Sequence, residues 1–146
     1  MMKNLMLDML LQSQISNGVT LKKVSNENAQ MKLNSASNSV GFIYRHIAET
    51  LNMFTFFFGL QPEVANTTMG QLDNGQGSNT DESSMLINKG FEKLNKLIEE
   101  KPEQFWLEEI ETPFFGKVSR FRIFSHILYH NSHHSGQIAA ILSKGK

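Results

Sequence analysis

The stretch FSHILYHNSHHSGQIAAIL, Phe124–Leu142, indicates the fold most directly, because its apolar residues recur with the period of a helix. It contains four of the chain's five histidines, His126, His130, His133 and His134. Each helical residue advances about 100° around the axis, which places His134 in the middle of the apolar stripe and His130 about 40° away. His126 and His133 lie on the flank of this stripe.

The axial spacing of these histidines limits which of them can share an ion. His126 and His134 are about 12 Å apart along a helix axis, whereas a metal–nitrogen bond is only about 2.1 Å long. His130 and His134 are one helical turn apart, the spacing at which two imidazoles can bind one metal. They are therefore the best ligand pair in the stretch.

The fifth histidine, His46, lies in a second predicted helix over residues 39–58. Phe42, Ile43 and Phe57 share its helix face, so His46 also points into the protein. Three inward histidines from two helices can form a metal site with open coordination positions, as catalytic metals require. A buried, hydrogen-bonded histidine cluster without metal stays open as an alternative.

Outward from these two helices, the pattern predicts two more helices and three connecting segments. They are a helix from Met2 to about Val24 with an end or kink at Asn17-Gly18, a connector at 25–38, a long loop at 59–80, a helix from Thr80 or Asp81 to about Glu100, and a turn or short extended piece at 103–118; Ser119 caps the last helix, which runs to about Ser143. No segment is a convincing strand. We expect an all-α four-helix bundle forming a single domain over residues 1–146, with a loop long enough for a crossover connection.

The composition narrows the classes of function. Lys plus Arg and Asp plus Glu number 14 each, so the neutral chain lacks the basic face that nucleic-acid binding requires. There is no cysteine, which excludes thiolate metal sites and a cysteine nucleophile. No apolar run approaches the roughly 18 residues of a membrane span. Asp8 interrupts the apolar N-terminal stretch, which argues against a signal peptide. We expect a cytoplasmic protein that acts on a small molecule.

The last helix resembles the DinB/YfiT-like superfamily, in which three histidines spaced four residues apart precede a Gly-Gln pair. The matching positions are His126, His130, His134, Gly136 and Gln137. Two upstream segments are similar to the family as well: NSVGFI and HIAE within 38–49, and PFFGKVSRFRIFSH at 113–126.

This resemblance implies a four-helix bundle that commonly forms a homodimer. It also implies a divalent metal bound by His46, His130 and His134, the set that the helical geometry favours independently. Imidazole ligands suit Zn²⁺, Ni²⁺, Mn²⁺ and Fe²⁺, so the ion is not distinguished. Ser135 stands where the family often has Arg, and any contact of that Arg with an anionic substrate would be missing.

Several polar neighbours are candidates for supporting roles. Glu49, one turn after His46, can orient a ligand histidine, act as a base, or simply be solvated. Gln137 can hydrogen-bond a ligand or a water, and Asn131 can do the same or satisfy a buried backbone group. Gly136 is expected to permit a close helix contact. His126 and His133 are flanking candidates that can also be merely solvated.

Two classes of function follow. As an enzyme, the protein would be a metal-dependent hydrolase or a transferase using a low-molecular-weight thiol, which would be a cosubstrate because the chain has no cysteine. The alternative is a non-catalytic, stress-related dimer that binds a metal or ligand. Phe56 points away from the predicted core, which indicates a dimer interface unless the loop at 59–80 covers it.

Overall fold

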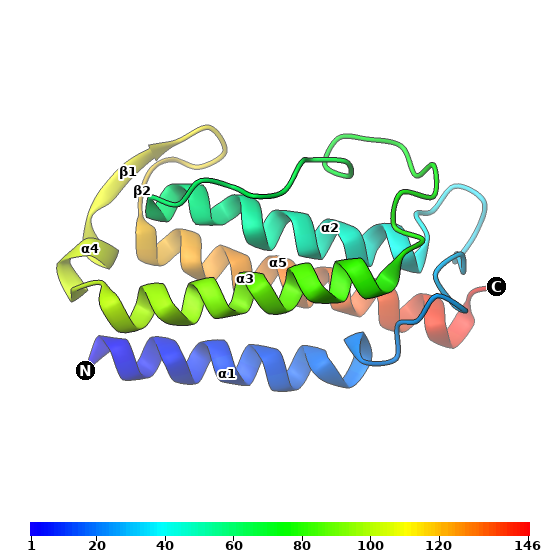
Figure 1. The fold of residues 1–146 in the computed structure, drawn as a ribbon, viewed down its shortest axis with the longest axis horizontal. Coiled ribbons are helices and arrows are strands. Elements are labelled where there is room, and N and C mark those ends of the chain that lie inside the picture. The colour runs from blue at the N-terminus through cyan, green and yellow to red at the C-terminus, as the bar shows by residue number, and fades with distance from the viewer.

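Four long helices pack side by side in the computed structural model, which describes residues 1–146 (Figure 1). They are α1 (Met2–Leu21), α2 (Val40–Met53), α3 (Thr80–Glu100) and α5 (Arg120–Lys144). The predicted all-α four-helix bundle is confirmed.

The helix directions follow from the long loop. In Figure 1, α2 and α3 run from right to left, whereas α1 and α5 run from left to right. Two successive helices can be parallel only if the chain returns along the bundle between them, and residues 59–79 do so by passing back over α2. The loop is thus the predicted crossover, and it lies against the helix that carries His46.

Short elements cover the end of the bundle at which α2 ends and α5 begins. They are the 3₁₀ helix η1 (Phe54–Phe58), α4 (Glu103–Leu107), and the antiparallel strands β1 (Glu109–Thr112) and β2 (Gly116–Ser119). The second helix therefore tightens before Gly59, whose φ of 87° terminates it. The expectation that the chain contains no strand is wrong, although the hairpin is only a small cover at the bundle end.

Side-chain caps fix the helix starts near the predicted positions. The Ser39 hydroxyl accepts a hydrogen bond from the Phe42 N–H at 3.3 Å, and the Ser119 hydroxyl accepts one from Arg122 N–H at 3.2 Å. Asn79 caps α3 in the same way. These bonds satisfy backbone donors that have no partner inside the helix.

Helix α1 is the peripheral member of the bundle. It buries only Met6 and Leu10, and it passes through Asn17-Gly18 to end at Leu21, so the expected break is absent. Several of its apolar side chains, including Leu5 and Val19, are exposed. None of the helices combines the length and the apolar character that a membrane span needs.

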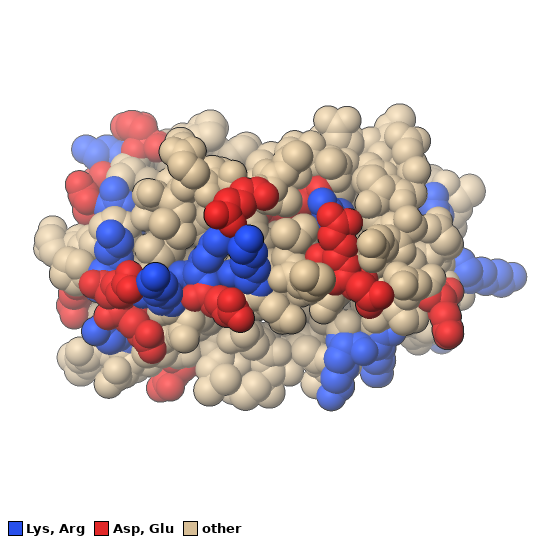
Figure 2. Space-filling view, viewed as in Figure 1, with Lys and Arg blue, Asp and Glu red and all other residues tan.

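The core lies between the four helices and is sealed by α4. Trp106 of α4 is buried with its ring 5.1 Å from that of Phe58 and 6.1 Å from that of Phe124, measured between centroids. Such edge-to-face contacts add to the hydrophobic gain of burial. Glu49 is the only Lys, Arg, Asp or Glu residue that is buried, and Figure 2 shows basic and acidic side chains interspersed over one face.

Candidate metal centre

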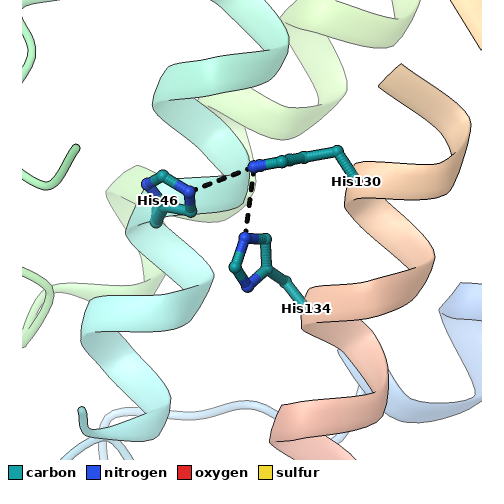
Figure 3. Close-up of side chains that lie close together, drawn as sticks. All are labelled: His46, His130 and His134. Atoms are coloured by element: carbon teal, nitrogen blue, oxygen red, sulfur yellow. Dashed lines mark hydrogen bonds between the residues drawn. The ribbon is translucent and has the colours of Figure 1, made fainter. Parts of the chain in front are cut away.

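Three histidines meet between α2 and α5. The Nε2 atoms of His46 and His134 each lie 3.1 Å from Nε2 of His130 (Figure 3). The three rings converge from neighbouring helices on one point. They are a group of potential ligands whose donor atoms lie within 4.8 Å of one another.

The other ring nitrogen of His46 is held by a threonine from the crossover loop. The Thr68 hydroxyl lies 3.1 Å from Nδ1 of His46 and donates its own proton to Oε2 of Glu49 at 2.7 Å. Because that proton is committed to the carboxylate, Thr68 can only accept from His46. Nδ1 of His46 is therefore the protonated nitrogen, and Nε2 carries the free lone pair.

The same logic applies to the two histidines of α5. The Thr50 hydroxyl donates to the carbonyl oxygen of His46 at 2.7 Å, so it acts as acceptor toward Nδ1 of His130 at 3.4 Å. The side-chain oxygen of Gln137 accepts from Nδ1 of His134 at 2.6 Å. All three rings are thus in the tautomer that leaves Nε2 unprotonated.

Three unprotonated nitrogens facing one another repel unless a cation lies between them. Two ligands each about 2.1 Å from an ion are about 3.0–3.4 Å apart for bond angles between 90° and 109°. The observed 3.1 Å separations lie within this range. The donor set, its tautomers and its spacing therefore fit a divalent transition metal.

Glu49 is fully buried, with 0% of its surface exposed, so the alternative of a solvated helix residue is wrong. Its carboxylate accepts from Arg45 Nε at 2.9 Å, from the backbone N–H of Thr67 at 2.9 Å, and from the hydroxyls of Thr67 and Thr68. Burial alone would raise the pKa of Glu49, but the bonds from Thr67, Arg45 and Thr68 outweigh it and lower the pKa. Glu49 is an ionised anchor linked through Thr68 to His46.

The histidines themselves are poor proton acceptors. Burial, reinforced by the neighbouring His134, lowers the pKa of His46 to about 4, although Glu49 opposes the shift. Burial and the surrounding histidines lower the pKa of His130 to about 3. Burial also lowers the pKa of His134. The cluster is therefore neutral at physiological pH, as metal ligands must be.

The two flanking histidines lie outside the cluster. His126 packs between two aromatic rings, with centroids 5.3 Å from Phe54 and 4.7 Å from Phe115, and burial lowers its pKa. His133 is exposed, with its ring 4.9 Å from that of His134. Neither belongs to the group of potential ligands.

Two other predictions for α5 turn out differently. Asn131 is 1% exposed but lines a separate cavity on the α1 and α3 side, and its side chain has no hydrogen-bond partner in the protein, so it satisfies no backbone group. Gly136 permits no close contact, because a Cβ there would meet nothing within 4 Å. Ser135 is buried, and its hydroxyl also has no partner in the protein.

A cavity of about 260 Å³ opens beside the histidines. His46, His134 and Gln137 form part of its wall, and the loop residues Thr68 and Met69 form another part. None of the lining residues is Lys, Arg, Asp or Glu. The histidine cluster therefore borders a small cavity without charged side chains.

The helical pattern identified the supporting threonines only in part. It places Thr50 on the same helix face as His46 but gives it no role, and Thr67 and Thr68 come from the irregular crossover loop. For these two the only signal was the length of the loop, since long loops in compact domains are often functional.

The fold and the site define a four-helix bundle with a three-histidine cluster between two of its helices. The chain belongs to the DinB family, whose model matches residues 1–145. No protein of curated function matches it in sequence.

Solved structures with similar folds include three of low sequence identity. They are a conserved protein of a locus from Enterococcus faecalis (TM-score 0.72, 13% identity, 97% of each chain covered), TT2238, a four-helix bundle protein (0.65, 15%, 94% of this chain and 98% of that one), and a DinB-like protein from Bacillus cereus (0.64, 17%, 92% and 89%). At these sequence identities the similarity concerns the fold alone.

Proposed function

We propose that this protein is a metal-dependent hydrolase of a small, uncharged substrate, with His46, His130 and His134 as the metal ligands. The observation that carries the proposal is the convergence of three unprotonated Nε2 atoms whose opposite nitrogens are all engaged. Three protein ligands would leave coordination positions free for water and substrate.

A bound divalent ion would polarise a substrate carbonyl and lower the pKa of a water molecule toward neutrality. The chain's own residues supply orientation. Thr68, Thr50 and Gln137 fix the three rings by accepting their Nδ1 protons. Such outer hydrogen bonds keep a ligand's lone pair directed at one point.

Glu49 acts in this scheme by positioning His46 through Thr68, and it is not the base. Four donors already occupy its oxygens, and its pKa is lowered, so it has little tendency to take a proton. Of the two protons of an attacking water, one would therefore go to solvent and the other would end on the leaving group.

The neutral cavity favours hydrolysis over thiol transfer. A glutathione-like cosubstrate carries carboxylates, and no Lys or Arg lines the cavity to pair with them. Water needs no such recognition.

The test compares neutral ester turnover by the wild type and by His130→Ala, each incubated with Zn²⁺, Ni²⁺ or Mn²⁺. We expect metal-dependent turnover by the wild type, lost in the variant and after chelation. Turnover that survives both treatments would place the reaction elsewhere. Conjugation of glutathione to an electrophile without ester turnover would replace hydrolysis by thiol transfer, and stoichiometric metal without either activity would favour the non-catalytic alternative.

A further inference from the structure

A second, apolar cavity of about 310 Å³ lies beside the first. Its walls include Phe54 and Phe57 from η1, Val64 and Met69 from the crossover loop, and Phe114 from the hairpin turn. Thr50 is its only hydrogen-bonding side chain, and no charged residue lines it. A space with this lining favours a ligand group without charge.

The two cavities share a wall. Met69 lines both of them. On α2, one helix face carries His46 at the first cavity and then Thr50 and Met53 at the second. Their axial distances from His46 are about 6 Å and 10 Å, within the length of a small organic molecule.

The apolar cavity also approaches the histidine cluster directly. Thr50, in its wall, is the hydrogen-bond partner of His130 Nδ1. The ring of Phe54 lies 6.3 Å from that of His130 between centroids. On the outer side, Phe56 and Phe114 are 56% and 60% exposed, so the cavity has an open rim.

We propose that the substrate carries an uncharged alkyl or aryl group that occupies this Phe-lined cavity while its reacting bond lies at the histidine cluster. This inference rests on the proposed function and names the substrate class. The occupant is a small molecule rather than a second copy of the chain, because Met69 separates this cavity from the one beside the histidines and Thr50 in its wall contacts His130.

Occupancy is tested without metal or turnover by using the uncharged fluorescent probe N-phenyl-1-naphthylamine. Val64→Trp fills the cavity from a loop position, and Val19→Trp makes the same change on the exposed face of α1. We expect wild type, Val19→Trp and His130→Ala to bind the probe, and Val64→Trp to bind it at least about tenfold more weakly. Met53→Trp, which fills the cavity from α2, checks that the loop change acts by volume.

Failure of the wild type to bind the probe, or binding by both cavity-filling variants as tight as that of the wild type, would overturn the proposal. Loss of probe binding as the protein forms a dimer, with the dimer followed by light scattering, would also overturn the proposal. Probe binding in His130→Ala is independent of the metal, so a protein that binds the probe but hydrolyses nothing would contradict the proposed function and leave the cavity as a ligand site.

Substrate preference is tested with p-nitrophenyl esters of increasing acyl length. Burying each added methylene should raise kcat/KM about fourfold until the cavity is full. The gradient should disappear in Val64→Trp and persist in Val19→Trp, while the two variants have the same metal content. A flat profile in the wild type would overturn the assignment of the cavity to the substrate.

Discussion

The hydroxyl of Thr68 connects a buried charge to a candidate ligand. It donates to Glu49 and accepts from His46, so one loop residue transmits the anchoring of the carboxylate to the imidazole. Thr67 donates to the same carboxylate, but its hydroxyl is bonded to Glu49 alone. Because of this difference, the effect of positioning His46 can be measured separately from the effect of stabilising the buried Glu49.

Thr68→Val should weaken metal binding by about 10- to 100-fold, because His46 loses the acceptor that fixes its tautomer. Thr67→Val is the matched control, since it also removes one hydroxyl donor from Glu49 but removes no hydrogen-bond acceptor from a histidine. Competition with a chromophoric chelator measures both affinities. Equal losses in the two variants would show that only the charge balance of Glu49 matters.

Metal binding at pH 6 should release few protons. Three ordinary imidazoles with a pKa of about 6.5 would together carry about two protons at this pH. Here the folded-state pKa values are lowered, to about 4 for His46 and about 3 for His130, so these two ligands are already deprotonated, and burial also lowers the pKa of His134. Calorimetry in buffers of different ionisation enthalpy measures the number released. Release of two protons would contradict the buried, neutral cluster.

At the scale of elements, the crossover loop is held to the start of α2 by a close backbone approach. A Cβ on Gly41 would lie 2.5 Å from the carbonyl oxygen of Gly77. Asp73 adds a hydrogen bond to the Ser39 N–H at 2.7 Å. Because the same loop brings Thr68 to His46, this contact helps to position the site.

Gly41→Ala should therefore destabilise the protein by about 1–3 kcal/mol, since the loop backbone must move. Gly136→Ala is the control on α5, where a Cβ meets nothing and the gain in helix propensity should stabilise by about 0.5–1 kcal/mol. Urea denaturation measures both free energies of unfolding. Similar values for the two variants would mean that the loop does not pack as tightly as described.

The helix pattern carries information about one helix at a time. It predicted the inward direction of His46, His130 and His134, and the structure brings these three together. It also placed Asn131 inward, but a helix in a bundle is buried on two sides, and Asn131 faces the other one. The sequence alone could not show which inward side belongs to the site.

The helical pattern of the sequence could not predict features that depend on contacts between distant segments. Glu49 reads as a surface residue until the loop covers it with Thr67 and Thr68. The hairpin was missed because each strand has only four residues, too few to show a clear alternation. The caps were predicted well because a serine before an apolar helix is a local signal.

At the scale of the whole molecule, the homodimer stays a prediction. Exposed apolar side chains are available for it on α1, where Leu5, Leu11, Ile15 and Val19 are each more than half exposed. Light scattering during size-exclusion chromatography should give twice the 16.6 kDa of one chain. A mass of 16.6 kDa at all concentrations would contradict the dimer.

The proposed chemistry depends on a metal ion bound between α2 and α5. The most direct measurement is elemental analysis of protein purified without a histidine tag, wild type beside His46→Ala/His130→Ala. We expect about one equivalent of a divalent transition metal in the wild type and none in the double variant. A wild type that holds no metal even after incubation with Zn²⁺, Ni²⁺ and Mn²⁺ would contradict the metal site and leave the histidines as a buried polar cluster.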